Sequence, residues 1–173
     1  MPLEDDLLAE GEPEREYHAG IAGRLARKRV AGGAIVRDEG SRILFVEPIY
    51  KPYLEIPGGF ADANESPRTA CRREIREELG MDLPVGGLLV VDWVPKHGVW
   101  GDGLMFIFDG GDLNASQIAS IRLPADELAA YKFLTLDEAL PFLKPSMARR
   151  LQLAYESLEH AGPPRYVEFS REH

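Results

Sequence analysis

Three glutamates stand close together in a segment that contains neither glycine nor proline, and carboxylates grouped in this way suit metal binding or acid–base chemistry. Glu74, Glu77 and Glu78 follow one another at i, i+3 and i+4, so a helix would hold all three within an arc of about 100°. Like charges at this spacing destabilise a helix, and they do so more strongly when they are buried. Hard divalent cations such as Mg²⁺ or Mn²⁺ would offset this repulsion, because they take oxygen ligands from carboxylates and substrate phosphates.

The segment that carries the glutamates has the start and stop signals of a helix over residues 67–79. Ser66 is suited to the N-cap, Pro67 to the first helical position, and Gly80 to a left-handed end. An apolar stripe at i, i+4 and i+8 runs beside the carboxylates and consists of Cys71, Ile75 and Leu79. The helix is therefore predicted to pack this stripe on a sheet and to hold its carboxylates toward a groove.

The wider spacing around the glutamates matches a known motif. Taken alone, a helix rich in Glu and Arg is usually a solvated face. From Gly59, however, there are five residues to Glu65 and seven more to the pair Arg73-Glu74, and the pattern continues to Met81. It resembles the Nudix box, G-x5-E-x7-R-E-U-x-E-E-x-G-U, where U is a bulky aliphatic residue, and every position is met. Seven fixed residue types at roughly 5–7% usage would coincide at about one starting point in 10⁹.

The resemblance implies a fold and a reaction. The fold is α/β, with a mixed β-sheet sandwiched between helices. The reaction is the Mg²⁺- or Mn²⁺-dependent hydrolysis of a diphosphate bond in a nucleoside diphosphate linked to a group X, a class that includes nucleoside triphosphates, ADP-ribose and NDP-sugars. Metal ions would neutralise the diphosphate and activate the attacking water, with a carboxylate taking its proton. They would also explain how a chain of net charge −9 accepts an anionic substrate.

The resemblance also implies roles for single residues. The candidate metal ligands are Glu74, Glu77, Glu78 and the backbone carbonyl of Gly58. The catalytic candidates are Glu74, Glu77, Arg73 and Glu127. The positions with a structural role in the motif are Gly59, Glu65 and Gly80, and Arg73 is similar to a residue that braces the loop and helix. Whether Glu74 is a ligand or the base stays open, because this role differs among family members. Glu127 is chosen as a downstream carboxylate just before a late strand, with Asp126 second.

Substrate contacts are expected in the stretch from Trp93 to Gly103. Trp100, flanked by glycines and an aspartate, could stack on a base, whereas Trp93 ends an apolar strand and is better explained by the core. Lys51 is a candidate phosphate contact, although solubility alone would also explain it.

The remaining elements are predicted from periodicity and turn signals. The predicted strands are residues 30–36, 43–46, 85–94 and 104–108, with a short extended piece over 51–57 and an edge strand or loose tail over 166–169. Thr135 opens a short helix that Pro141 limits, and Ser146 is predicted to cap a longer one. We therefore divide the chain into an N-terminal arm (1–29), a Nudix hydrolase domain (30–162) and a C-terminal tail (163–173). The sequence leaves several interpretations of this arm open. It could be a solvated helix or a frayed terminus, or it could form a dimer contact or a substrate lid.

Composition and charge exclude several classes of protein. The negative charge argues against a nucleic-acid partner, and a single cysteine excludes an intramolecular disulfide or a cysteine zinc cluster. The chain starts without the features of a signal peptide, and its apolar runs are too short to span a bilayer, so a cytoplasmic protein is expected. Family members are often dimers, which makes a homodimer one expectation.

Two alternatives to the hydrolase remain. One is a non-catalytic Nudix domain that senses a nucleotide, although such proteins usually carry a broken box. The other is a fold relative that isomerises a prenyl diphosphate, which would need a catalytic cysteine in a context that Cys71 lacks.

Overall fold

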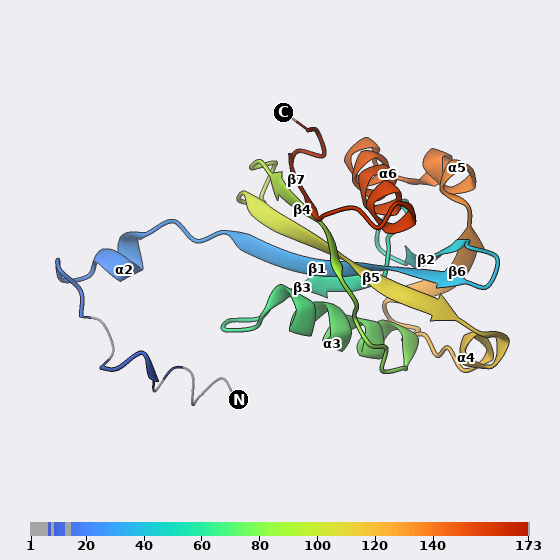
Figure 1. The fold of residues 1–173 in the computed structure, drawn as a ribbon, viewed down its shortest axis with the longest axis horizontal. Coiled ribbons are helices and arrows are strands. Elements are labelled where there is room, and N and C mark those ends of the chain that lie inside the picture. The colour runs from blue at the N-terminus through green and yellow to red at the C-terminus, as the bar shows by residue number, and fades with distance from the viewer. Residues whose placement is uncertain (1–6, 8, 13–14, 173) are drawn as a thin grey trace.

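The protein is a mixed β-sheet covered by a helix on each face (Figure 1). The structure, a computed structural model, describes all residues except 1–6, 8, 13–14 and 173. The strands are β1 (Arg29–Asp38), β2 (Ile43–Pro48), β3 (Gly58–Phe60), β4 (Leu88–Val94), β5 (Gly103–Leu113), β6 (Leu128–Leu134) and β7 (Arg165–Glu168). The helices are α2 (Ile21–Arg24), α3 (Pro67–Leu79), α4 (Ala115–Ala119), α5 (Leu136–Ala139) and α6 (Pro145–Glu159), with a 3₁₀ turn, η1 (Leu140–Phe142), before α6.

The sheet has seven strands in the order β6-β2-β1-β5-β4-β7, with β3 paired to β1 beside this path. The β1–β5 and β4–β7 pairs are parallel, and the other pairs are antiparallel. Helix α3 packs on one face and α6 on the other, and each face has its own apolar cluster. The predicted α/β architecture, a mixed sheet between helices, is therefore confirmed.

Helix α3 has the predicted ends and packs its predicted face. The Ser66 side chain accepts a hydrogen bond from the backbone N–H of Thr69, and Gly80 ends the helix at φ 70°. The stripe of Cys71, Ile75 and Leu79 is fully buried. At the start of the helix, a Cβ on Gly32 of β1 would lie 2.1 Å from the carbonyl oxygen of Pro67. This glycine lets α3 lie directly on the strand, which brings its glutamates to the centre of the sheet.

Several predicted boundaries are wrong. Ser146 does not cap α6: Lys144 is the N-cap and Pro145 the first helical residue, because the fixed φ of proline suits that position. The short extended piece expected over 51–57 pairs with the sheet at one position, where Glu55 makes an isolated antiparallel bridge to Val46 between Pro52 and Pro57.

Other strands differ in length. The strand predicted over 85–94 begins at Leu88, after two glycines, and the strand predicted over 104–108 extends over Gly103–Leu113. The short strand β3 and the helix α4 were not predicted. The C-terminal segment forms an edge strand, β7, parallel to β4, which confirms the first of the two alternatives.

The described part of the N-terminal arm extends away from the sheet (Figure 1). Its short helix α2 has no buried residue. Much of the acidic part of the arm, including Glu4, Asp5, Asp6 and Glu14, lies outside the described residues. None of the helices in the described part of the chain combines the length and apolar character needed to cross a membrane.

Candidate active site

Two of the three box glutamates of α3, Glu74 and Glu78, line a cavity of about 680 Å³. Strands β1 and β5 line it from the sheet side, and β3, α3 and the start of α6 contribute further walls. Five carboxylates line this cavity, and they are Glu55, Asp62, Glu74, Glu78 and Glu127. Five cationic side chains also line it, and they are Arg29, Lys51, Arg73, Lys144 and Arg150. The cavity therefore holds both acidic and basic groups.

Glu78 is the most deeply buried of the box carboxylates, with 7% of its surface exposed. The backbone N–H of Gly58 donates a hydrogen bond of 2.9 Å to its Oε2 atom. Burial raises the pKa of Glu78 to about 8, and the negative charges of Glu74, Glu127 and Glu55 act in the same direction. No ion pair involves Glu78 among the described residues. When Glu78 ionises, its carboxylate therefore has the Gly58 N–H as a hydrogen-bond donor but no cationic partner within the described part of the chain.

Glu74 lies one turn before Glu78 and is half-buried. Burial raises its pKa, although the neighbouring Arg73 guanidinium, at 2.9 Å from Oε1, opposes the shift. Its carboxyl group lies against the backbone of Gly59, where a Cβ atom would be 2.4 Å from the carboxyl carbon. Gly58 has a comparable restriction, with φ 141° and only 2.3 Å from its ideal Cβ to the carbonyl oxygen of Gly32. The paired glycines therefore allow the helix carboxylates and the β1–β3 backbone to approach closely.

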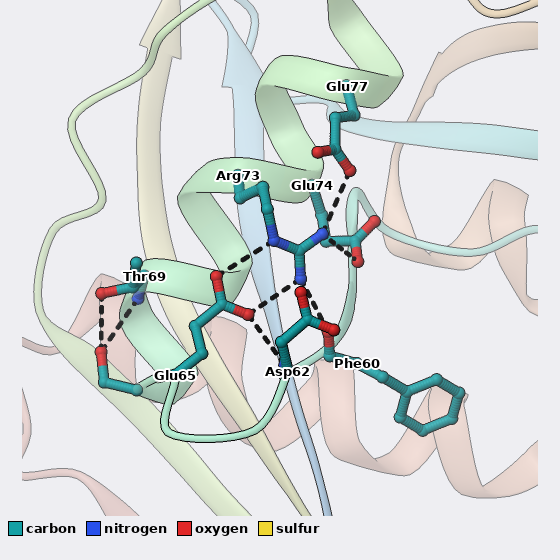
Figure 2. A network of polar contacts seen from close by, with 8 residues as sticks. Phe60, Asp62, Glu65, Thr69, Arg73, Glu74 and Glu77 are labelled. Atoms are coloured by element: carbon teal, nitrogen blue, oxygen red, sulfur yellow. Dashed lines mark hydrogen bonds and ion pairs between the residues drawn. The ribbon is translucent and has the colours of Figure 1, made fainter.

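Arg73 joins the loop before α3 to the helix (Figure 2). Its Nε and Nη2 atoms donate to the two carboxylate oxygens of Glu65, at 3.0 and 2.9 Å. Nη2 also donates to the carbonyl oxygen of Phe60, at 2.9 Å, and Nη1 to Glu74 and Glu77, at 2.9 and 3.1 Å. The same guanidinium lowers the pKa of Glu65. Arg73 thus makes the bracing contacts that the resemblance implies.

The structure brings some predicted residues to the cavity and leaves others outside it. Glu127 lies in the turn before β6 and lines the cavity, whereas Asp126 does not. Glu77 is also outside the lining, with 54% of its side chain exposed and its carboxylate bonded to Arg73. Gly80 ends α3 and is not among the residues that line the cavity.

The two predicted substrate contacts line the cavity. Trp100 is exposed, and Lys51 forms an ion pair of 2.8 Å with Glu55. Trp93 is not in the lining; it is half-buried, and its indole N–H donates to Asp102.

Sequence reasoning missed several residues of the cavity. Glu55 lies between buried Leu54 and Ile56, so simple alternation in an extended segment would have turned it to the opposite side. Arg150 lies on a mostly apolar helix face, where it forms a buried ion pair of 2.7 Å with Asp92 of β4. No local pattern identifies this pair, because its members are far apart in the sequence.

The residues present fit a divalent cation of the Mg²⁺ type. Within the described residues, no three His, Cys, Asp or Glu side chains are grouped closely enough to hold a metal ion by themselves. Mg²⁺ does not require such a cage, because it keeps several waters and is usually bound by one or two carboxylates together with substrate phosphates. Glu78, buried and without a cationic partner, and Glu74, one turn away, supply two such carboxylates.

Cys71 is unsuited to catalysis. It is fully buried in the apolar stripe of α3, and burial raises the pKa of its thiol to about 12. A buried thiol that stays protonated is a poor nucleophile or base, so the structure disfavours the isomerase alternative.

Comparison with known proteins agrees with this geometry. The family model described as the NUDIX domain matches residues 27–154. A MutT-like protein of Streptomyces ambofaciens is 28% identical over 131 residues, which cover 76% of this chain and 77% of that protein. A putative 8-oxo-dGTP diphosphatase 2 of Mycobacterium tuberculosis is 44% identical over 64 residues, covering 33% of this chain and 44% of that protein.

Solved structures share the fold. A crystal structure of a UDP-X diphosphatase matches with a TM-score of 0.68 at 20% identity, covering 95% of this chain and 74% of that one. The MutT protein from Methanosarcina mazei Go1 matches with a TM-score of 0.63, also at 20% identity, covering 80% of this chain and all of that one. The family model spans most of the chain, and it includes both the complete box and the strands that surround it. The chain therefore belongs to the Nudix hydrolase family.

Proposed function

We propose that this protein is a Mg²⁺-dependent (or Mn²⁺-dependent) pyrophosphohydrolase that cleaves a diphosphate bond in a nucleoside diphosphate derivative. Hydrolysis of a phosphoric anhydride bond is the chemistry of the family to which the chain belongs. The observation that carries the proposal for this chain is the buried carboxylate of Glu78. It lines the same cavity as Glu74 and Glu127, and no cationic side chain of the described residues pairs with it.

The residues of the cavity have complementary tasks in this proposal. Glu78 would hold the cation, with Glu74 as either its second ligand or the general base, and the cation when bound would neutralise the diphosphate and lower the pKa of a coordinated water. Glu77 remains a predicted ligand whose carboxylate bonds Arg73 in this structure. Arg73 fixes the orientation of Glu74 and ties it to the loop through Glu65 and Phe60.

Proton transfer would fall to a carboxylate at the cavity. A general base should have a pKa that is not far below the working pH, and burial raises the pKa of Glu74 in that direction. Glu127 faces the same cavity from the turn before β6 and is the second candidate. Lys51 and Lys144 line the cavity as well and would contact anionic groups of the substrate.

The names of the curated relatives favour nucleoside triphosphates within the proposed substrate class. One relative is described as MutT-like and another as a putative 8-oxo-dGTP diphosphatase. We therefore rank nucleoside triphosphates, including oxidised dGTP, ahead of ADP-ribose and NDP-sugars. The small-molecule substrate, the cytoplasmic location and the homodimer remain predictions from the sequence.

A phosphate-release panel tests the proposal. The panel contains nucleoside triphosphates with 8-oxo-dGTP, ADP-ribose, NDP-sugars and dinucleoside polyphosphates, each assayed with Mg²⁺ and with EDTA. The variants are Glu78→Gln and, as a matched control, Glu39→Gln, which changes an exposed glutamate of the β1–β2 turn. We expect Mg²⁺-dependent turnover of one class by the wild type and by Glu39→Gln, and none by Glu78→Gln. No turnover across the panel, with nucleotide binding still measurable, would overturn the proposal in favour of a nucleotide sensor.

A further inference from the structure

A buried polar cluster joins the C-terminal segment, residues 165–172, to the cavity. Asp92 of β4 is fully buried, and Arg150 of α6 and Ser170 of the C-terminal segment both bond to its carboxylate. Arg150 lines the cavity, whereas Asp92 and Ser170 do not. The C-terminal segment lies outside residues 27–154, which the family model matches. A part of the chain beyond the family match therefore reaches a wall of the candidate active site through one shared carboxylate.

Four contacts hold the carboxylate of Asp92. Its Oδ2 atom accepts from Nε of Arg150 at 2.8 Å, forms the ion pair with Nη2 at 2.7 Å, and accepts from the Ser170 hydroxyl at 2.7 Å. Its Oδ1 atom accepts from the backbone N–H of Ser170 at 2.9 Å. Arg150 is 6% exposed and Ser170 is 2% exposed. Ser170 therefore fixes the orientation of the carboxylate on which Arg150 is held.

The backbone of the C-terminal segment takes an uncommon conformation to place Ser170. Phe169 and Ser170 have φ angles of 50° and 60°, in the left-handed region that residues other than glycine seldom adopt. Two backbone hydrogen bonds between Glu168 and Arg171 close the turn, and the N–H of Phe169 donates to the carbonyl of Trp93 at 2.7 Å. Strained conformations of this kind persist where the surrounding contacts determine them. The result of the turn is that the Ser170 side chain points into the protein.

Arg150 has one nitrogen that Asp92 does not use. Among the described residues, the only hydrogen-bond contact of Nη1 is with the sulfur of Met147, at 4.0 Å. A thioether sulfur is a weak acceptor. Because the Asp92 carboxylate already offsets the charge of the guanidinium, Nη1 is suited to act as a directed hydrogen-bond donor. An oxygen atom of a ligand in the cavity would be a better acceptor than the sulfur.

We propose that Arg150 donates a hydrogen bond from Nη1 to an oxygen atom of the substrate. Ser170 is then a positioning residue, which holds Arg150 for this contact through Asp92. The class of substrate rests on the proposed function, since a nucleoside diphosphate derivative offers acceptor oxygens in its phosphates and in its nucleoside. The C-terminal segment thus forms part of the substrate site in addition to its place at the edge of the sheet.

Binding of an analogue that cannot be hydrolysed at its diphosphate tests the proposal. In α,β-methylene-ADP a carbon bridge replaces the anhydride oxygen, and calorimetry with Mg²⁺ measures its affinity for the whole chain. Arg150→Lys keeps a positive charge beside Asp92 and removes Nη1, so the dissociation constant should rise about tenfold. Ser170→Gly removes only the hydroxyl, because glycine keeps the backbone N–H and suits the φ of 60°. It should raise the dissociation constant about threefold.

The double variant separates positioning from general loosening of the fold. If Ser170 acts through Arg150, the double variant Arg150→Lys/Ser170→Gly should bind the analogue no more weakly than Arg150→Lys alone. Glu172→Gln is the matched control in the C-terminal segment, because it removes an ion pair of 3.2 Å with Arg165 and leaves Ser170 on Asp92. It should bind like the wild type. Circular dichroism should show that all four variants are folded.

Wild-type affinity in Arg150→Lys or in Ser170→Gly would overturn the proposal. Independent, additive losses in the double variant would overturn it as well, and so would failure of the wild type to bind the analogue. Methylenediphosphonate, which has no nucleoside, locates the acceptor when the losses are as expected. Weaker binding of this probe to Arg150→Lys assigns the acceptor to a phosphate, and unchanged binding assigns it to the nucleoside.

The proposed hydrolase and the role of the C-terminal segment can fail separately. If the analogue binds through Arg150 and Ser170 while no diphosphate in the panel is hydrolysed, only the proposed hydrolase fails. If hydrolysis stands and every variant binds the analogue like the wild type, only the proposal for Arg150 and Ser170 fails.

Discussion

Replacing Glu78 by glutamine should stabilise the metal-free protein while it removes the proposed metal ligand. The carboxyl of Glu78 has a pKa raised to about 8, against 4.5 for the unperturbed group. Between pH 4.5 and pH 8 the folded protein keeps a proton on Glu78 that the unfolded chain has lost. The free energy of unfolding therefore falls as the pH rises through this range. Because a tenfold change in proton affinity is worth about 1.4 kcal/mol, this single group costs the folded state about 4 kcal/mol by pH 8.

The glutamine variant avoids this cost. Its amide is neutral at every pH, and its side-chain oxygen can accept the hydrogen bond that Gly58 donates to Glu78. Urea unfolding in EDTA should therefore show nearly equal stabilities for wild type and Glu78→Gln near pH 5. The variant should become the more stable protein as pH rises, by up to about 4 kcal/mol at pH 8.

Mg²⁺ provides the second half of this experiment. Excess Mg²⁺ should raise the stability of the wild type at pH 8, because a cation that binds only the folded state stabilises it, and it should have little effect on Glu78→Gln. Glu39→Gln should follow the wild type throughout. Parallel pH profiles for wild type and Glu78→Gln in EDTA, or a Glu78→Gln variant that is the less stable protein at pH 8, would refute the reasoning about Glu78.

Three further changes test the parts that surround the carboxylates. Arg73→Lys cannot reproduce the forked contacts of the guanidinium, so kcat/KM for the substrate found in the panel should fall about 10- to 100-fold with a similar urea midpoint. Gly59→Ala would put a Cβ within 2.4 Å of the Glu74 carboxyl carbon and displace it, which should lower kcat about 100-fold; unchanged kcat would contradict this packing. Asp92→Ala leaves Arg150 buried without its partner and should cost about 3 kcal/mol in urea unfolding, whereas a wild-type midpoint would show that the pair contributes nothing.

Local signals in the sequence account for the helix that carries the site. The hydroxyl of Ser66, the ring of Pro67 and the missing Cβ of Gly80 act within a few residues of the positions they affect, so both ends of α3 were predictable. The start of α6 was misread because two residues competed for it. Ser146 is a good N-cap, but Pro145 before it suits the first helical position and moves the start two residues earlier, with Lys144 as the N-cap.

Contacts between distant segments could not be predicted in this way. Strand β1 pairs with β5, some seventy residues further along the chain, and only this pairing brings Arg29 beside Trp100. The burial of Glu78 has the same origin, because it depends on how closely β3 and α3 approach each other. The spacing of the box therefore identifies the candidate site residues. Their burial, and the charged groups that lie beside them, depend on the tertiary structure.

The exposed position of Glu77 shows the same limit. On a helix, Glu74, Glu77 and Glu78 share one arc, yet only the first and last line the cavity. Arg73 holds the carboxylate of Glu77 at 3.1 Å, outside this lining. Helical periodicity gives the direction of a Cβ atom, but the partner that a long side chain reaches depends on its neighbours.

Mn²⁺ binding measured by electron paramagnetic resonance tests the central claim most directly, because it requires no knowledge of the substrate. The signal of free Mn²⁺ is recorded during titration of the wild type, Glu78→Gln and Glu39→Gln. A metal site built on Glu74 and Glu78 predicts that the wild type and Glu39→Gln bind Mn²⁺ with the same affinity and that Glu78→Gln binds at least about tenfold more weakly. Equal Mn²⁺ affinity in Glu78→Gln and the wild type would contradict the assignment of the metal site to these carboxylates.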